Sequence, residues 1–465
     1  MKKMILPVLF CLFAFNSLQA QYTIENQFSM PLKEVFRAME EKYGVQIVCP
    51  ANLSEGKSVK YGLYQFKPDF LQTLDIVLSK FDLDYTVDPD GAYRIKTFEY
   101  ARRRPQEGAD RLNGLMAEYD TLEEWEARKA ELKNCLYHTL GLAPIRDKLV
   151  LRMTTTPRRK MDGYTVENFA LETLPGVYAT GSVYRPLRTK RGEKWAFILN
   201  PNGHFPTGRY YKDIQTRCAM MARMGAIAVD IDLFGYGESL LAFTPEDHRN
   251  SMALTMHSLQ NMALLDYFLS QPDIDPQRVG VTGASGGGSQ TMVLTALDER
   301  VAVSAPVVMV SSYFMGGCGC ESGLPIGWCG GGTNLAEIAA MAAPRPMLVV
   351  SDGKDWTMQV DRVEYPFIQR TYGFYGAEKK VQNLHLAEEG HDFGPSKRQA
   401  VYAFLAAELG LNAAAAQDKE GNWDESKVTV EPETALKVFG PAGERFPADA
   451  VRGIENLYRL VESYR

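Results

Sequence analysis

Three residues of the 465-residue chain have the types and the order that nucleophilic catalysis needs: Ser285, Asp355 and His391. A serine hydroxyl attacks a carbonyl carbon when a neighbouring base takes its proton and an acid orients that base. In one widespread arrangement the serine comes first along the chain, the acid second and the histidine last. We therefore expect Ser285 to be the nucleophile, His391 the base and Asp355 the acid.

The serine lies in the stretch Gly283-Ala284-Ser285-Gly286-Gly287, which fits the G-x-S-x-G pattern. An apolar β-branched run precedes it and a helical pattern follows, so the serine is expected on a tight strand-to-helix turn. The backbone N–H of Gly286 would then lie at a helix N-terminus, where it can stabilise an oxyanion. The motif alone is weak evidence, since a glycine-rich turn can be only a turn.

The proposed acid and base each follow a later predicted strand. Asp355 comes shortly after the strand Pro346–Val350, and His391 comes after the strand Gln382–Leu386. Open α/β sheets place their ligand-binding groups at the carboxyl ends of strands, which is where both residues are expected. Asp352 lies on the same loop as Asp355 and is the alternative acid.

A second oxyanion donor is expected from the loop that follows the buried strand Lys194–Leu199. Gly203 lets the backbone of this loop approach closely. The N–H of His204 or of Phe205 would pair with that of Gly286, and the sequence leaves open which of the two donates. His204 could equally contact the substrate or be an ordinary loop residue.

Two aromatic residues are expected to contact the substrate. Trp356 would offer a flat face to a sugar ring, with a place in the core as the alternative, and Phe205 lies on the oxyanion loop. The other four histidines are interpreted as structural, packing or surface residues: His138, His248, His257 and His385.

Composition and charge limit the class of protein. At 45% hydrophobic and 23% charged residues the chain is typical of soluble globular proteins, and its length allows two or three domains. The net charge of −6 argues against a nucleic-acid-binding protein, which would need a basic surface. No apolar run after residue 20 is long enough to span a bilayer.

The first 20 residues are typical of a secretory signal peptide. Lys2 and Lys3 precede the apolar run Met4–Phe15, and the small residue Ala20 precedes the expected cleavage before Gln21. The mature protein is therefore expected to be exported, with the periplasm as the predicted compartment.

Export allows disulfides to form. Cys318, Cys320 and Cys329 lie in one glycine-rich loop, and a local disulfide within this group is the favoured prediction. A metal site is the weaker alternative, because this spacing is not a usual zinc pattern. Cys135 and Cys218 are expected to be free buried thiols. The proposed reaction needs neither a metal nor an organic cofactor.

The periodicity divides the mature chain into three parts. Residues 21–97 predict a small α+β domain, residues 98–145 a helical linker, and residues 146–465 an α/β domain with a C-terminal extension. In the last part strands alternate with helices, which predicts a mostly parallel sheet covered on both faces. The C-terminal extension is expected to contain a strand at Val428–Glu431 and a helix at Ala448–Tyr464.

The first domain resembles the secretin and TonB short N-terminal domain. The resemblance lies in the segments "MPLKEVFRAMEEKYGVQIVC" and "FLQTLDIVLSKFDLDYTVDPDGAYRIK". It implies a small interaction module of the periplasm, without catalytic residues, that could bind an envelope protein through residues 22–97. A plain accessory domain is the alternative.

Residues 120–465 resemble the acetyl-xylan-esterase-like α/β-hydrolases of exported polysaccharide-degrading systems. The segments that carry the resemblance are "DGYTVENFALETLPGVYATGSVYRP", "LNPNGHFPTGRYYKDIQTRCAMMARMGAIAVDIDLFGYGES", "VGVTGASGGGSQT" and "AAPRPMLVVSDGKDWT…EEGHDFG". It implies an α/β-hydrolase fold, the triad named above, Gly286 with the His204 loop as oxyanion hole, and carbohydrate esters as substrates. Glucuronoyl esterases typically have an arginine after the nucleophile, where this chain has Gly286.

The sequence therefore predicts an exported serine esterase that removes acetyl or methyl groups from plant polysaccharides such as xylan or pectin. One alternative is a pectin methylesterase specifically. Another is a serine exopeptidase of the same fold, although such enzymes usually carry a β-propeller or an acidic pair for the substrate amine, and neither is found. A third is a non-catalytic protein that binds glycan or an envelope partner.

Overall fold

The computed structural model describes residues 29–464, except 61–65, 82, 98–104, 188–191, 206, 324 and 325. The chain forms two compact units, with the boundary between residues 98 and 99. The predicted signal peptide lies outside the described residues, as does the segment Tyr22–Phe28, whose alternating sequence predicts a strand. Within the described part, every helix is too short or too polar to cross a bilayer.

The first unit is a small α+β fold. A two-stranded antiparallel sheet pairs β1 with β3, and a second sheet has the strand order β2-β5-β4. The apolar spacing of Pro31–Tyr43 predicts an amphipathic helix, and the structure confirms it, since Leu32, Val35, Phe36 and Met39 are all buried on one face of α2. Its elements are β1 (Ser29–Pro31), α2 (Leu32–Tyr43), β2 (Ile47–Val48), α3 (Ala51–Ser54), β3 (Ser58–Lys60), α4 (Phe70–Ser79), β4 (Leu83–Val87) and β5 (Tyr93–Thr97).

The second unit is built on a ten-stranded sheet. Its order is β15-β14-β13-β12-β10-β11-β9-β8-β6, with β7 paired to β8. The strands from β15 to β11 run parallel, and β9, β8, β7 and β6 add an antiparallel end. The predicted mostly parallel sheet is confirmed. Its strands are β6 (Arg152–Thr155), β7 (Arg159–Lys160), β8 (Tyr164–Leu174), β9 (Val177–Pro186), β10 (Trp195–Pro201), β11 (Ala226–Ile231), β12 (Ile274–Ala284), β13 (Val303–Val307), β14 (Met347–Asp352) and β15 (Val381–Leu386).

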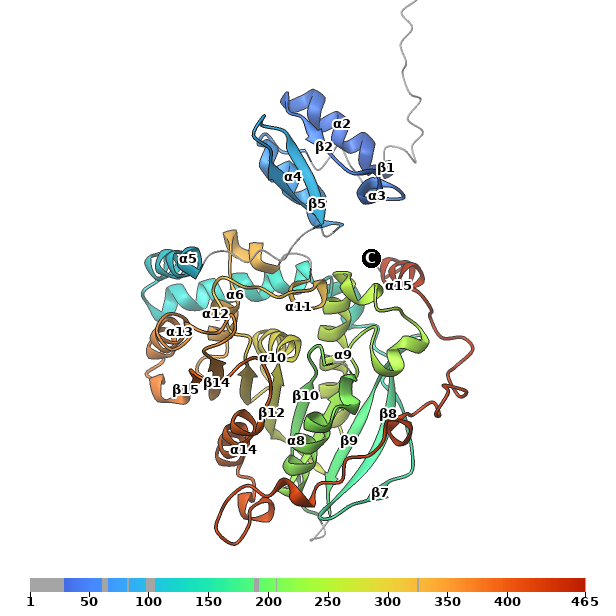
Figure 1. Ribbon diagram of the computed structural model, residues 1–465, viewed down its shortest axis with the longest axis vertical. Helices are drawn as coiled ribbons and strands as arrows, with labels where there is room; N and C mark the ends of the chain where they lie inside the picture. The colour runs from blue at the N-terminus through green and yellow to red at the C-terminus, as the bar shows by residue number, and fades with distance from the viewer. Residues whose placement is uncertain are drawn as a thin grey trace, which may run out of the picture. The chain divides into compact units, whose positions relative to one another are not determined.

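Helices cover both faces of this sheet (Figure 1). Within β10, Phe197 and Leu199 belong to the apolar cluster that includes residues of α6, α9, α10, α12 and α13, while Ala196 and Ile198 belong to the cluster that includes residues of α8 and α14. This alternation follows from the two-residue period of a strand, and each face buries one apolar core. These helices are α6 (Leu122–Thr139), α8 (Lys212–Arg223), α9 (Met252–Leu269), α10 (Gly286–Leu297), α12 (Leu335–Ala340), α13 (Glu364–Gly373) and α14 (Pro395–Leu409). The second unit also contains α5 (Pro105–Glu118) and the short helices α7 (Ala143–Arg146), η4 (Asp247–Arg249), α11 (Gly319–Ser322) and η5 (Ile326–Gly331).

The helical segment before the sheet belongs to the core of the second unit. Trp125, Leu132 and Leu136 of α6 are fully buried in the same apolar cluster as α9 and α10. A complete capping box of Thr121 and Glu124 begins this helix. The segment predicted as a linker therefore packs as part of the α/β unit.

The C-terminal extension packs on the second unit, with one predicted element absent. Residues 428–431, all described, form no strand. The Tyr164 hydroxyl accepts a hydrogen bond from Thr429 N–H, and Arg159 forms an ion pair with Glu431 at 2.6 Å. Side-chain contacts thus hold this extended segment without a ladder of backbone hydrogen bonds. The last helix, α15 (Ile454–Glu462), begins after Gly453 and not at Ala448.

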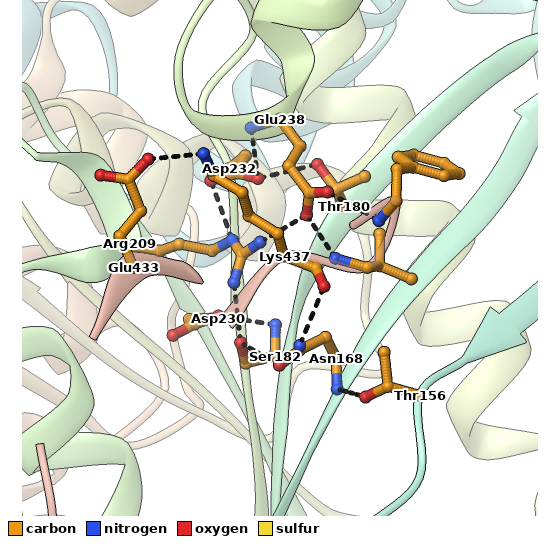
Figure 2. Close-up of polar contacts among 12 residues, drawn as sticks. Thr156, Asn168, Thr180, Ser182, Arg209, Asp230, Asp232, Glu238, Glu433 and Lys437 are labelled. Carbon is orange, nitrogen blue, oxygen red and sulfur yellow. Dashed lines mark hydrogen bonds and ion pairs between the residues drawn. The ribbon is translucent and has the colours of Figure 1, made fainter. Parts of the chain in front are cut away.

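A buried ionic network joins the extension to the sheet (Figure 2). Arg209 is fully buried and contacts Asp232 Oδ1 at 2.9 Å and Glu238 Oε2 at 2.8 Å. Glu238 also accepts hydrogen bonds from the backbone N–H groups of Val438 and Phe439. Burial raises the pKa of Glu238, and the charge of Arg209 opposes this effect.

Arg209→Met is expected to lower the free energy of unfolding by about 3–5 kcal/mol, because it leaves two buried carboxylates without their cation. Urea unfolding measures the change. Arg152→Met is the matched control: Arg152 is 75% exposed beside Glu172, so its loss should cost less than about 1 kcal/mol. Equal stabilities of the two variants would contradict a structural role of the network.

Candidate active site

Ser285 lies in a strained turn between β12 and α10. Its backbone has φ 57° and ψ −125°, a region that non-glycine residues avoid and that costs about 1–3 kcal/mol. The flanking glycines are needed for space: a Cβ on Gly283 or on Gly287 would lie 2.4 Å or 2.3 Å from the carbonyl oxygen of Pro201. The strand-turn-helix context predicted for Ser285 is therefore confirmed.

The loop after β10 passes directly over this turn. A Cβ on Gly203 would lie 2.5 Å from the carbonyl oxygen of Ala284 and 3.2 Å from the backbone nitrogen of Gly286. The N–H of Phe205 donates to the carbonyl oxygen of Gly203 at 2.9 Å. Of the two donors that the sequence left open, this hydrogen bond favours the N–H of His204 as the partner of Gly286.

Gly203→Ala is expected to lower kcat about 10²–10³-fold, the cost of losing one oxyanion donor, because the added methyl group pushes the loop away from the turn. Steady-state kinetics on a chromogenic ester measure it. Gly114→Ala is a control for the glycine change, since Gly114 lies in the helix α5 and a Cβ there would meet only the end of the Arg111 side chain, at 3.9 Å. An unchanged kcat for Gly203→Ala would separate this loop from the reaction.

His391 and Asp355 form a hydrogen-bonded pair. His391 Nδ1 lies 2.7 Å from Asp355 Oδ2, so the ring donates from Nδ1 to the carboxylate. The acid side chain is 3% exposed and the imidazole 31% exposed. His391 follows β15, Asp355 follows β14 and Ser285 follows β12. The three residues therefore lie at the carboxyl edge of one set of parallel strands.

Asp355 is held in its charged form. Burial by itself raises its pKa, but hydrogen bonds from His391 and from the hydroxyl and N–H of Thr357 outweigh burial and leave the pKa below its ordinary value. An ionised carboxylate here keeps the proton of the imidazole on Nδ1, an arrangement in which Nε2 can accept a proton.

Asp352, the alternative acid, has other partners. It is fully buried and lies 3.4 Å from Lys397 Nζ, and its backbone N–H donates to the hydroxyl of Thr357. Burial and the nearby charge of Asp355 raise the pKa of Asp352 to about 6, with Lys397 opposing. The structure thus places Asp355, and not Asp352, beside His391.

Lys397 and Thr357 are supporting residues that the sequence did not indicate. The Lys397 ammonium is fully buried and donates to the carbonyl oxygen of Gly390 at 2.6 Å and to Asp392 at 2.7 Å. It therefore braces the loop that carries His391. On the sequence it is one lysine in the first turn of an amphipathic helix, and nothing there distinguishes it from an exposed lysine.

The two predicted aromatic contacts lie differently. The ring centroid of Trp356 lies 4.3 Å from that of His391 and 4.4 Å from that of Phe314, so this ring packs against the imidazole and supports it. The ring of Phe205 stacks on that of Tyr211, with 5.5 Å between the ring centroids. A contact of either ring with a substrate stays a prediction.

The predicted cysteine pairing is wrong. Cys329 forms a disulfide with Cys135, which joins η5 to α6 across 194 residues, so Cys135 is not a free thiol. Cys218 is free and buried, as predicted. Cys318 and Cys320 are free and lie together with His204 and His248. His248, expected to pack or to lie at the surface, is 2% exposed and belongs to this group.

The sheet order and the serine at a strand-to-helix turn place the second unit among the α/β-hydrolases. A solved structure described as methylesterase BT1017 is 43% identical, with 95% of this chain and 97% of that chain covered and a TM-score of 0.73. The chain belongs to the same family as this methylesterase, a family of ester-hydrolysing enzymes.

Two other solved structures match less closely. A putative acetyl xylan esterase from Bacteroides fragilis is 16% identical, covering 70% of this chain and 92% of that one, with a TM-score of 0.44. A glucuronoyl esterase from Solibacter usitatus is 14% identical, covering 62% and 94%, with a TM-score of 0.44. No protein-family model and no curated protein matches the chain.

Proposed function

We propose that the protein is an exported serine carbohydrate esterase that hydrolyses methyl esters of plant polysaccharides, with pectin as the substrate class. The observation that carries the proposal is the His391–Asp355 hydrogen bond of 2.7 Å at the sheet edge where Ser285 lies in a strained turn. Both the strained serine and the buried acid are costly features that a purely structural role does not need.

In this mechanism Ser285 Oγ attacks the ester carbonyl carbon while His391 Nε2 takes its proton. The N–H groups of Gly286 and His204 donate to the oxyanion. His391 then gives the proton to the departing alcohol, and water activated by the same imidazole hydrolyses the acyl-enzyme. Asp355 orients the ring and stabilises the imidazolium throughout.

The methyl ester is favoured over the acetyl ester by the relative that shares 43% of its residues, which is described as a methylesterase. The two substrates differ in what the site must hold. With a methyl uronate the sugar becomes the acyl group on Ser285 and methanol leaves. With an acetylated sugar the acetyl group stays on the serine and the sugar leaves.

Product analysis tests the choice. The mature protein is incubated with methyl-esterified pectin and with acetylated xylan, and methanol and acetate are measured separately, with Ser285→Ala protein as the blank. Methanol from pectin supports the proposal. Acetate without methanol would replace it by a deacetylase, and neither product from either polymer would refute the esterase.

We also propose that the chain is exported to the periplasm and that its first unit binds an envelope protein. The support is the charged and apolar start of the sequence and the compact α+β fold of residues 29–97. Cell fractionation tests the location, and a cytoplasmic protein that begins at Met1 would refute it. Crosslinking in cells, with a chain lacking residues 22–97 as the control, tests the partner.

A further inference from the structure

Four side chains beside the candidate active site form what we call the His-Cys cluster: His204, His248, Cys318 and Cys320. Each offers one nitrogen or sulfur atom, and these four atoms all lie within 4.8 Å of one another. They come from three separate segments: the loop after β10, η4, and the start of α11 with its preceding residue.

The contacts that the two Nδ1 atoms make with oxygen atoms turn the Nε2 atoms of the rings toward each other. His248 Nδ1 lies 2.6 Å from the carbonyl oxygen of Phe234, and His204 Nδ1 lies 3.5 Å from a carboxylate oxygen of Glu321. Carbonyl and carboxylate oxygens only accept, so each Nδ1 carries the proton. The two Nε2 atoms then face each other at 2.7 Å, an arrangement that needs either a proton shared between the two rings or a metal cation between them.

The two cysteine sulfur atoms lie beside the two Nε2 atoms. Cys320 Sγ lies 3.1 Å from His204 Nε2, and Cys320 and His248 are 1% and 2% exposed. Neither cysteine forms a disulfide. Four ligands of a tetrahedral zinc ion lie about 3.3–3.8 Å apart, given zinc–sulfur and zinc–nitrogen bonds of about 2.3 and 2.1 Å. The cluster needs only a small widening of its closest pair to reach that geometry.

We propose that the His-Cys cluster binds one Zn²⁺ through His204 Nε2, His248 Nε2, Cys318 Sγ and Cys320 Sγ. Two thiolates and two imidazoles favour zinc over hard cations such as Mg²⁺ or Ca²⁺. Oxygen acceptors on both Nδ1 atoms are the usual second layer of a histidine–zinc site. With four protein ligands no position is open for water, so the ion is structural and ties three loops together.

The zinc would also fix the oxyanion loop. Glu321, which contacts His204, lies against the strained turn at Ser285: a Cβ on Gly286 would be 3.3 Å from its Oε1. Its other oxygen accepts from the N–H of Gly317 at 2.5 Å. The ion would thus hold the main chain of His204, the proposed second oxyanion donor, and this consequence rests on the proposed function.

Metal content tests the site without reference to activity. The mature full-length chain is produced without a polyhistidine tag in zinc-supplemented medium, and bound metals are measured by mass spectrometry after gel filtration. We expect about one equivalent of zinc per chain in the native protein and in Cys218→Ala, which removes a buried free thiol outside the cluster. Cys320→Ser and His248→Gln should lose most of this zinc.

Cobalt replacement of the native chain needs no variant and guards against misfolding. Co²⁺ in a two-thiolate tetrahedral site gives intense visible bands and thiolate charge-transfer bands, which zinc then abolishes. A native protein with no transition metal and no such spectrum would overturn the proposal. A Cys318–Cys320 disulfide found by peptide mapping, or full zinc in Cys320→Ser, would overturn it as well.

The link to catalysis has its own readout. Stripping the zinc with dipicolinate should lower kcat about 10²–10³-fold with KM little changed, and added zinc should restore it. An unchanged kcat after stripping would refute the positioning role while the zinc site stands. Zinc bound by a protein that hydrolyses no ester would refute the proposed function alone.

Discussion

Ser285→Ala is expected to lower kcat on the methyl ester about 10⁶-fold, leaving only what binding and the oxyanion hole contribute. The serine hydroxyl is the only atom that forms the acyl-enzyme in the proposed mechanism, so no neighbour can replace it. The folded structure should persist, because alanine removes one oxygen atom and keeps the backbone. Circular dichroism and a urea unfolding curve check this.

Ser289→Ala is the matched control. Ser289 is one turn further along α10, fully buried, and its hydroxyl has no hydrogen-bond partner in the described part of the chain. This variant removes the same atom from the same helix and is expected to keep the native kcat. A burst of methanol equal to the enzyme concentration in native protein, absent from Ser285→Ala, would identify the acyl-enzyme. Equal activity of native and Ser285→Ala protein would refute the triad.

Local patterns predicted the parts of the site that depend on local geometry. The glycines beside Ser285 predict the tight turn because a Cβ at Gly283 or Gly287 would meet the Pro201 carbonyl oxygen, so only glycine fits at these positions. The alternation of apolar strands and amphipathic helices likewise predicted the parallel sheet and its two cores. Such signals lie within a few residues of the feature that they encode.

Features that join distant segments could not be predicted. The Cys135–Cys329 disulfide spans 194 residues, and nothing near Cys329 reveals that α6 lies against its loop. The His-Cys cluster takes its histidines from two segments far from the cysteines, so a search for zinc spacing along the chain misses it. Val428–Glu431 has the composition of a strand, but the side chains of Tyr164 and Arg159, more than 260 residues earlier in the chain, hold this segment instead of a backbone ladder.

The choice between Asp352 and Asp355 as the acid also depends on contacts between segments that are far apart in the sequence. On the sequence Asp352 and Asp355 differ only in their distance from the end of the strand. In the fold, Lys397, 45 residues further along the chain, lies 3.4 Å from Asp352 and pairs with its charge, while Asp355 faces His391. The two carboxylates therefore should differ in what their loss does to the reaction.

Asp355→Asn is expected to lower kcat about 10⁴-fold at neutral pH. Thr357 donates its hydroxyl and its N–H to Oδ1 of Asp355, at 2.6 and 2.5 Å. In the variant these two donors hold the amide oxygen, so the amide NH₂ must point at His391 Nδ1. Nδ1 then accepts, the ring proton moves to Nε2, and the imidazole can no longer take the proton of Ser285.

Asp352→Asn is the comparison that separates the two acids. It leaves the His391–Asp355 hydrogen bond in place, so its kcat should fall far less than that of Asp355→Asn. Its main effect should be on stability, because Lys397 stays buried with one carboxylate fewer. Kinetics on the same ester and urea unfolding of both variants measure the two effects. If Asp352→Asn instead had the larger loss of kcat, His391 would be oriented by Asp352 during the reaction and the assignment of Asp355 would be wrong.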